Sequence, residues 1–353
     1  MVAFTIAAST GSYEVVVESG SAETVAADRW IIDDQVRVLY PQLGDAAAVP
    51  FHASEEHKTL AGCEEVLAGL HQSGLRRGMT VAAAGGGSVQ DIGTFATSVY
   101  MRGVPWIFLP TTALSMADSC IGGKSSLNLR GVKNLVGNIY PPQRVVVDPV
   151  FLGTLDDVAR ACGLAEAVKI CFASGQESFE EFVGFDRTAA TLGADPASVA
   201  LIAHTLRAKK CFIEADEFDG GVRLHLNFGH SFGHALEAAT GYAMPHGLAV
   251  AFGMVAACLH PGAAHTPGTQ SLIDYVRGLV RPLGTDVLER MLSWDRVQFV
   301  QALASDKKNS ASALRLILPA VGGGVSLVDF PMEAKQLDTC RDAMAAAMVT
   351  VMP

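Results

Sequence analysis

The chain has 353 residues, of which 50% are hydrophobic and 18% are charged, enough for two domains with large apolar cores. Its formal net charge of −10 at pH 7 argues against a nucleic acid partner. The seven cysteines are scattered without a Cys-x-x-Cys pair, as is typical of buried thiols in a reducing compartment. The N-terminus lacks the pattern of a signal peptide, and the longest nearly apolar run, 247–259, is too short to span a bilayer. We therefore expect a cytoplasmic protein with no membrane partner.

Short β-type runs alternate with helical patterns up to about residue 150, and long helices follow. The predicted strands are 13–17, 30–33, 80–84, 106–110 and 144–148, with predicted helices at 60–73 and 89–100. The later predicted helices are 157–173, 196–215, 230–243 and 247–258, with a loop at 261–268 and β-type runs at 314–318 and 325–329. This order predicts an α/β domain with a mainly parallel sheet over 1–150 and a mostly helical domain over 151–353.

A glycine turn follows the predicted strand 80–84. The sequence Gly85-Gly86-Gly87 leads through Ser88 into a helical pattern, and a helix N-terminus after such a turn offers backbone N–H groups to a phosphate or pyrophosphate. The turn is not a full Gly-x-Gly-x-x-Gly fingerprint, so an ordinary tight strand–helix turn is the alternative. The later run from Gly122 to Ser125 is no P-loop, because Asp118 stands where that motif needs its first glycine.

Charged and polar residues occur in apolar or glycine-bearing segments of both halves. They are Asp118, Lys124, Lys133, Asn134, Glu166, Lys169, Lys209, Lys210, Arg223, Lys307 and Lys308. Glu166 and Lys169 would share one face of a helix. Any single lysine could be a solvated surface charge, but the set as a whole suits a substrate with phosphate and carboxylate groups.

Three histidines lie close together in the segment NFGHSFGHALEAATGYAMPHG, which covers 227–247. His230 and His234 would share one helix face, and His246 follows beside a glycine. Neutral imidazoles in this arrangement suit a divalent ion such as Zn²⁺, which needs a further ligand from elsewhere, for example a carboxylate. From the spacing alone, His234 is a candidate ligand, and a pair of helix-surface histidines is the alternative.

Four runs together resemble the motifs of the 3-dehydroquinate synthase family, which belongs to the sugar phosphate cyclases. They are GGGSVQDIGTFATSVYMRGV, PTTALSMADSCIGGKSSLNLRGVKNLVG, GLAEAVK and RLHLNFGHSFGHALE, and the resemblance extends over about 33–322. It implies an N-terminal Rossmann-like NAD-binding domain and a mostly α-helical metal-binding domain. The chain departs from the family at Leu248 and Asp219, where glutamate is usual, and in the wording of the segment before GLAEAVK.

The resemblance also implies roles for individual residues. The implied metal ligands are Glu166, His230 and His246. The resemblance implies that His234 is instead a phosphate-contacting or proton-shuttling residue. The implied NAD-binding residues are Asp33, Glu55, Lys58, Gly86, Gly87, Ser88, Asp91, Thr111, Thr112, Asp118, Lys133 and Asn134. The implied catalytic and substrate-binding residues are Asp118, Lys124, Lys169, Lys209, Arg223, Asn227, His234 and Lys308, with Arg102 reaching the phosphate bound by a neighbouring subunit.

The implied reaction converts 3-deoxy-D-arabino-heptulosonate 7-phosphate to 3-dehydroquinate. It proceeds by transient oxidation with NAD⁺, phosphate elimination, reduction and aldol closure, assisted by Zn²⁺ or Co²⁺, in a homodimer. One alternative is a related cyclase of secondary metabolism, which acts on an amino analogue or another sugar phosphate; Arg223 and Asn227 favour a substrate carboxylate. Another is a metal-dependent alcohol dehydrogenase of the glycerol dehydrogenase type, against which the lysine set argues. A metal- and nucleotide-binding regulator is the non-enzyme alternative.

Overall fold

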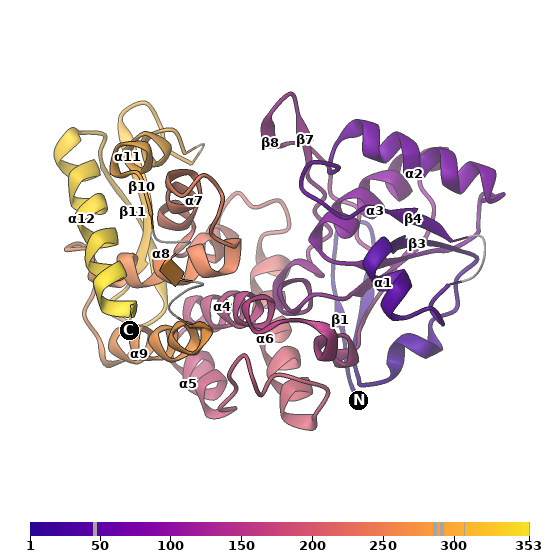
Figure 1. Cartoon of the computed structure of the whole chain (residues 1–353), viewed down its shortest axis with the longest axis horizontal. Coiled ribbons are helices and arrows are strands. Elements are labelled where there is room, and N and C mark those ends of the chain that lie inside the picture. The colour runs from indigo at the N-terminus through magenta and orange to yellow at the C-terminus, as the bar shows by residue number, and fades with distance from the viewer. Residues whose placement is uncertain (45–47, 285–287, 290–292, 307, 353) are drawn as a thin grey trace. The chain divides into compact units, whose positions relative to one another are not determined.

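The computed structural model describes residues 1–44, 48–284, 288–289, 293–306 and 308–352, which form two compact units (Figure 1). The first unit consists of Met1–Leu155 and Leu192–Glu217. The second consists of Asp156–Thr191 and Phe218–Pro353. Each unit is built from two separate stretches of chain.

A seven-stranded sheet forms the centre of the described part of the first unit, in the order β1-β2-β9-β6-β5-β3-β4. The strands are β1 (Val2–Ile6), β2 (Tyr13–Val17), β3 (Arg29–Asp33), β4 (Val49–Phe51), β5 (Val81–Gly85), β6 (Trp106–Pro110) and β9 (Arg144–Val147). Only β1 pairs antiparallel in this sheet, so the predicted mainly parallel α/β sheet is confirmed. Every residue of β5 is buried, as expected of a central strand in a parallel sheet with both faces covered.

The chain order of the strands creates a topological switch point in this sheet. From β3 the chain goes outward to the edge strand β4, then returns to β5 on the other side of β3 and continues to β6 and β9. The carboxyl ends of β3 and β5 therefore flank the position at which open α/β sheets bind ligands. Asp33 ends β3, and the glycine turn follows β5.

Helices and short turns connect these strands. They are η1 (Ser21–Thr24), α1 (Asp34–Leu39), α2 (Leu60–Gln72), α3 (Gly87–Val99), η2 (Tyr100–Arg102), η3 (Ser115–Ser119) and η4 (Pro149–Thr154). A hairpin of β7 (Leu127–Leu129) and β8 (Val132–Val136) is labelled in Figure 1. Its two-residue turn, Arg130-Gly131, has φ values of 50° and 81°, which fit the turn type that tight hairpins prefer.

Helix α6 (Pro196–Ala215) belongs to a different unit from the one that the predicted boundary gives it. A single boundary near residue 150 assigned it to the helical domain, whereas the structure packs it against β1, β2 and η3 of the first unit. The backbone N–H of Ala7 donates to Oε1 of Glu214 at 2.8 Å. The predicted helix 196–215 is confirmed, but periodicity alone does not indicate which part of the fold a helix packs against.

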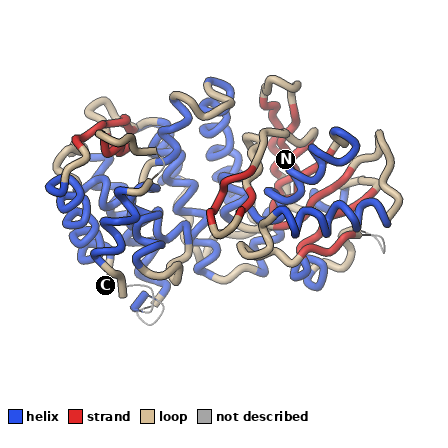
Figure 2. Tube along the Cα trace, turned by 90° about the horizontal axis from the view of Figure 1, so that it is seen from above, coloured by secondary structure: helices blue, strands red, loops and turns tan. Residues whose placement is uncertain are grey.

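In its described residues, the second unit is mostly helical, with one β-hairpin (Figure 2). Its elements are α4 (Asp157–Ser174), α5 (Gln176–Gly184), η5 (Val222–Asn227), α7 (His230–Ala239), α8 (His246–Leu259), α9 (Pro267–Val280), η6 (Arg281–Leu283), α11 (Arg296–Ala304), β10 (Ala313–Pro319), β11 (Val325–Pro331) and α12 (Ala334–Val351). Helix α8 is buried from Gly247 to Cys258 and packs against α4, α7 and α12. It is therefore the core of this unit.

Two predicted boundaries in the second unit are corrected by the structure. The helix predicted over 230–243 ends at Ala239, where the N–H of Thr240 bonds back to the carbonyl of Leu236. The loop predicted over 261–268 ends earlier, because Thr266 forms a capping box with Thr269 and Pro267 starts α9. Within the described ranges, the helices are too short or too polar for any of them to cross a bilayer.

Candidate active site

Three histidines meet where α7 and α8 pack together in the second unit. The candidate ligand atoms of His230, His234 and His246 all lie within 4.8 Å of one another. Glu166, on α4, joins them, because its Oε1 is 3.4 Å from Nε2 of His246. Three helices therefore bring three imidazoles and one carboxylate together, which is the kind of donor set that holds Zn²⁺ or a similar ion.

Glycines allow these helices to approach closely enough. A Cβ added to Gly253 of α8 would lie 2.1 Å from the carbonyl oxygen of Gly229, the residue before α7. A Cβ added to Gly247, next to His246, would lie 2.5 Å from Cα of Cys162 on α4. Backbone thus packs directly against backbone on both sides of α8, and the ligand-bearing residues are drawn into one small volume.

The environment keeps two of the histidines neutral at pH 7. Burial, together with the charge of Lys169, holds the pKa of His230 well below its usual value. Burial and the charge of Lys308 lower the pKa of His234 to about 4, although His234 is an exposed residue and water moderates this effect. Burial also opposes protonation of His246, but the hydrogen bond with Glu237 and the charge of Glu166 outweigh it and raise its pKa. Neutral imidazole is the form that binds a metal ion.

Two lysines accompany the histidine cluster. Lys169 forms an ion pair with Glu166 in which both side chains are only 2% exposed. Lys308 is held by Asp306, whose Oδ1 accepts from the backbone N–H at 3.0 Å and whose Oδ2 lies 3.3 Å from Nζ. The charges of both lysines lower the pKa of His230, so both act on the same site. Lys307, the other lysine considered above, lies outside the described residues.

Arg223 and Asn227 lie on η5, which leads through Gly229 into α7. Arg223 is 4% exposed, and Nδ2 of Asn227 donates to the carbonyl of Leu224 at 3.1 Å. Gly229 adopts φ 77°, a left-handed conformation that suits glycine and turns the chain into the helix. The two residues therefore precede His230 by a short, well-defined segment, and their contact with a substrate stays a prediction.

The glycine turn in the first unit has the form expected of a phosphate-binding helix start. Gly86 is the N-cap of α3, and no side chain in the described part of the chain caps it. A Cβ at Gly86 would lie 2.9 Å from Cγ2 of Thr112, whereas one at Gly87 would meet no described atom within 4 Å. The N–H of Thr111 donates to the carbonyl oxygen of Gly85 at 2.9 Å, and the hydroxyl oxygens of Thr112 and Ser115 lie 2.8 Å apart. Ser88 lies in the first helical turn. An open helix N-terminus of this kind suits a pyrophosphate.

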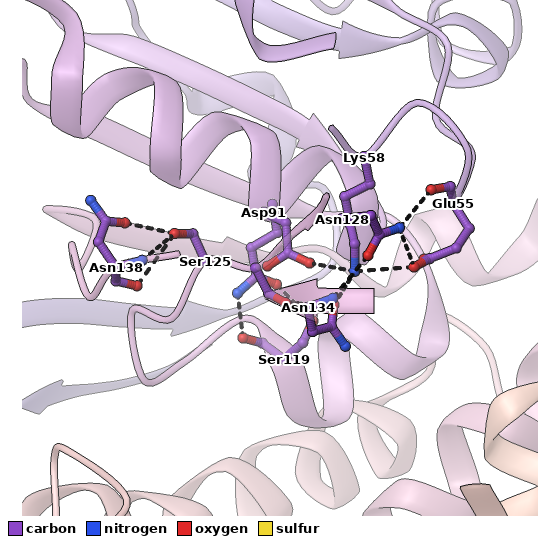
Figure 3. Close-up of polar contacts among 10 residues, drawn as sticks. Glu55, Lys58, Asp91, Ser119, Ser125, Asn128, Asn134 and Asn138 are labelled. Carbon is purple, nitrogen blue, oxygen red and sulfur yellow. Dashed lines mark hydrogen bonds and ion pairs between the residues drawn. The ribbon is translucent and has the colours of Figure 1, made fainter. Parts of the chain in front are cut away.

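Lys58 is the centre of a polar cluster beside α3 (Figure 3). Its Nζ lies 3.2 Å from Oδ2 of Asp91 and 3.5 Å from Oε1 of Glu55, and it donates to Oδ1 of Asn134 at 2.8 Å. Asn128 donates to Oε1 of Glu55 at 2.8 Å and accepts from the N–H of Asn134 at 2.9 Å. The structure therefore brings four of the predicted NAD-binding residues into direct contact and ties them to the β7–β8 hairpin.

Lys209 and Asp118 form a second polar contact in the first unit. Nζ of Lys209 lies 2.5 Å from Oδ1 of Asp118 and donates to the carbonyls of Asp118 at 2.6 Å and Ile121 at 3.2 Å. Asp33 caps α1 by accepting from the N–H of Gln35 at 2.7 Å. Lys124 forms an antiparallel bridge with Ile139 through its backbone.

Arg102 and Lys133 are placed differently from the rest. Lys133 is exposed on β8. Arg102 is exposed after the C-terminal end of α3, whose N-terminal end holds the glycine turn. A helix of this length separates its ends by about 20 Å, so Arg102 does not join the glycine turn within one chain. Met101 and Arg102 both have positive φ, 48° and 68°, a sparsely populated conformation that marks this turn as constrained.

Reading the sequence missed three polar partners of the candidate site: Glu237, Asp306 and Asn128. Glu237 accepts from Nδ1 of His246, with 3.3 Å between the atoms. It lies seven residues after His230, so helix periodicity places both on one face and could have revealed it. No comparable signal exists for Asp306 or Asn128, because their partners are reached through loop and hairpin geometry.

Comparison with known proteins identifies the family that the chain resembles. The family model described as 3-dehydroquinate synthase N-terminal matches residues 48–161, and the C-terminal model of the same name matches residues 163–309. The chain is 34% identical over 306 residues to a 3-dehydroquinate synthase of Streptococcus pneumoniae, covering 83% of this chain and 84% of that protein.

Two solved structures share the fold over almost the whole chain. A 2-deoxy-scyllo-inosose synthase complexed with carbaglucose-6-phosphate, NAD⁺ and Co²⁺ has a TM-score of 0.82 at 21% identity, covering 98% of this chain and 99% of that one. A 2-epi-5-epi-valiolone synthase from Streptomyces hygroscopicus subsp. jinggangensis 5008, with NAD⁺ and Zn²⁺ bound, has a TM-score of 0.76 at 25% identity and covers 98% of each chain.

Proposed function

The chain belongs to the 3-dehydroquinate synthase family, and we propose that it converts 3-deoxy-D-arabino-heptulosonate 7-phosphate to 3-dehydroquinate with release of phosphate. In this proposal the protein is a carbon–oxygen lyase that depends on NAD and on a divalent ion. Support for both cofactors comes from the related cyclases, one solved with NAD⁺ and Co²⁺ and the other with NAD⁺ and Zn²⁺.

The proposed metal ligands are Glu166, His230 and His246. The donor types fit Zn²⁺ or Co²⁺, and the lowered pKa of His230 leaves its ring ready to bind at neutral pH. When bound, NAD⁺ supplies a reversible hydride acceptor and the divalent ion a Lewis acid that acidifies the hydroxyl to be oxidised. The protein's own residues then bind and orient the substrate.

One observation carries the choice of a phosphorylated keto acid: Lys169 and Lys308 both act electrostatically on His230, in the same unit as Arg223. The planar fork of Arg223, with Asn227 nearby in sequence, suits a carboxylate. Lys308 and the neutral His234 suit the phosphate, where the ring of His234 can donate or accept a proton. A simple alcohol dehydrogenase would gain little from such a set of cations, and it would release NADH.

The proposed NAD site lies on the first unit, at the carboxyl ends of β3 and β5. The N–H groups of Gly87 and Ser88 would face the pyrophosphate, and Asp33 would accept from a ribose hydroxyl. Lys58 would hold Asp91 and Asn134 in place around the nucleotide. The remaining residues proposed to bind NAD are Glu55, Gly86, Thr111, Thr112, Asp118 and Lys133.

Metal removal tests this proposal. Treatment with a chelator should abolish the release of phosphate from the keto acid phosphate, and Zn²⁺ or Co²⁺ should restore it. Glu166→Ala should lose both metal and turnover, because it removes one of three protein ligands. Glu177→Ala, at an exposed carboxylate on α5, is the matched control and should retain both. Full metal content and full activity in Glu166→Ala would contradict the ligand assignment.

A further inference from the structure

His246 lies between two carboxylates that contact different nitrogens of its ring. Nδ1 lies 3.3 Å from Oε2 of Glu237, and Nε2 lies 3.4 Å from Oε1 of Glu166. Glu166 belongs to the proposed ligand set, whereas Glu237 does not. Glu237 lies in the last turn of α7, and its side chain is only 14% exposed. The His246 ring therefore has the proposed ligand Glu166 at one nitrogen and Glu237 at the other.

This geometry determines which nitrogen can bind a metal ion. A neutral imidazole has one N–H and one lone pair, and the group bonded to one nitrogen sets the state of the other. A carboxylate at Nδ1 can only accept, so it favours the proton on Nδ1 and leaves the lone pair on Nε2. Nε2 is the nitrogen on the side of Glu166. Glu237 thus presents the lone pair of His246 toward the other ligands and limits rotation of the ring.

Electrostatics act in the same direction. The charge of Glu237 makes the imidazole a better electron donor, and carboxylates in this position commonly increase metal affinity. The connection between α7 and α8 is short, running from Thr240 to Pro245. From α7, the rings of His230 and His234 lie against the ring of His246, with centroids 5.3 and 5.6 Å away, and Glu237 adds a hydrogen bond to its Nδ1.

We propose that Glu237 is a positioning residue for the metal site, which fixes the orientation and ring tautomer of His246 and thereby raises the affinity for the divalent ion. The inference rests on the proposed function, because it requires that His246 binds a metal ion. It predicts a property of the metal site that can be measured without turnover.

The test is the Zn²⁺ dissociation constant, measured by competition with a chromogenic chelator on the full-length chain. Glu237→Gln keeps the shape and an acceptor but loses the charge, and should bind Zn²⁺ about tenfold more weakly. Glu237→Ala loses both, and should bind up to about 100-fold more weakly. Glu333→Gln is the matched control, because Glu333 is exposed, lies in the same unit and makes no side-chain capping bond among the described residues. It should bind as the parent protein does.

A second measurement separates positioning from a general effect on folding. The melting temperatures of the metal-free proteins should agree within about 2 °C for the parent and Glu237→Gln, whereas with saturating Co²⁺ the visible absorption bands of the variant should shift. Zn²⁺ affinities of both Glu237 variants within twofold of the parent would overturn the inference. A loss of affinity accompanied by an equal loss of metal-free stability would overturn it too. If the parent chain itself binds no Zn²⁺, the proposed function fails as well, so the two failures are distinguishable.

Discussion

Lys58, Lys169 and Lys209 are each less than a tenth exposed, and each is paired with a carboxylate. Burying an ammonium is costly unless a partner offsets the loss of hydration. Replacing such pairs with apolar residues often leaves stability unchanged or improves it, so stability alone does not explain their retention. We propose that these lysines hold charged groups ready for NAD and substrate.

Asp91 should make the stability of the first unit depend on pH. Burial raises its pKa to about 6, even though Lys58 beside it acts in the opposite direction, and the ordinary value is 3.8. Between these values the folded state binds the proton more tightly than the unfolded state. The contribution of Asp91 to the free energy of unfolding is therefore fully present below about pH 4 and is lost as the pH rises through about 6. Asp91→Asn removes this dependence.

Relative to the parent, the free energy of unfolding of Asp91→Asn should thus rise by about 2 kcal/mol between pH 4 and pH 7. Urea denaturation followed by tryptophan emission measures it. The chain has three tryptophans, and a Trp294→Phe background leaves only Trp30 and Trp106, both in the first unit. A flat difference, or one that falls with pH, would show that the pKa of Asp91 is not raised.

At the scale of elements, the contact between α7 and α8 controls the geometry of the histidine cluster. Two glycines, Gly229 and Gly253, meet there with no room for a side chain. His230 and His234 lie on one side of this contact and His246 on the other, so the helix separation sets the distances between their rings. These ring centroids lie 5.3–5.6 Å apart.

Gly253→Ala should therefore disturb both folding and metal binding. The added methyl group would lie 2.1 Å from the carbonyl oxygen of Gly229, and the helices must separate to admit it. We expect a loss of about 2 kcal/mol in the free energy of unfolding, together with weaker Zn²⁺ binding.

Gly278→Ala on α9 is the matched control, because a Cβ there meets no described atom within 4 Å. It should be neutral or stabilising by about 0.5 kcal/mol, since alanine favours helix. Denaturation followed by circular dichroism compares the two variants. Equal stabilities would mean that the close contact of α7 and α8 is not required.

Local sequence patterns predicted many of these helices and strands, but not how all of them pack together. Seven strands and six helices were predicted because apolar periodicity reflects burial, whereas the long helices α9 and α12 were not predicted. The edge strand β1 was not predicted either, because its alternating burial leaves a short and weak pattern. The assignment of α6 to the first unit could not be predicted, since that depends on a chain segment returning from the second unit.

The same limit applies to the candidate site. Spacing brought His230, His234 and His246 together correctly, yet spacing cannot tell a metal ligand from a neighbour that binds phosphate. Glu166 entered through the family resemblance and is found beside His246. Asp306 was not predicted, because its bond to Lys308 depends on the local turn after α11.

For the whole molecule, the position of Arg102 has a consequence for assembly. It lies away from the glycine turn of its own chain, and we propose that it serves the active site of a second copy in a homodimer. An Arg102→Ala chain and a Glu166→Ala chain should each be inactive alone. In a mixed dimer, however, the site of the first would receive Arg102 from the second.

Unfolding and refolding the two variants together tests this. Random pairing should restore about a quarter of the parent activity, since half of the dimers are mixed and each has one complete site. Refolding each variant alone under the same conditions is the control and should restore none. No recovery in the mixture, with mixed dimers demonstrated by two different affinity tags, would place the function of Arg102 within its own chain.

The central claim is that NAD⁺ is used and regenerated within one turnover. Purified protein, Zn²⁺, the heptulosonate phosphate and NAD⁺ at well below the substrate concentration should release one phosphate per substrate and yield the carbocyclic product, while absorbance from NADH does not accumulate. The predicted result is that phosphate release continues long after the amount of substrate converted has exceeded the amount of NAD⁺ added. Steady formation of one NADH per substrate consumed, or no phosphate release at all, would contradict it.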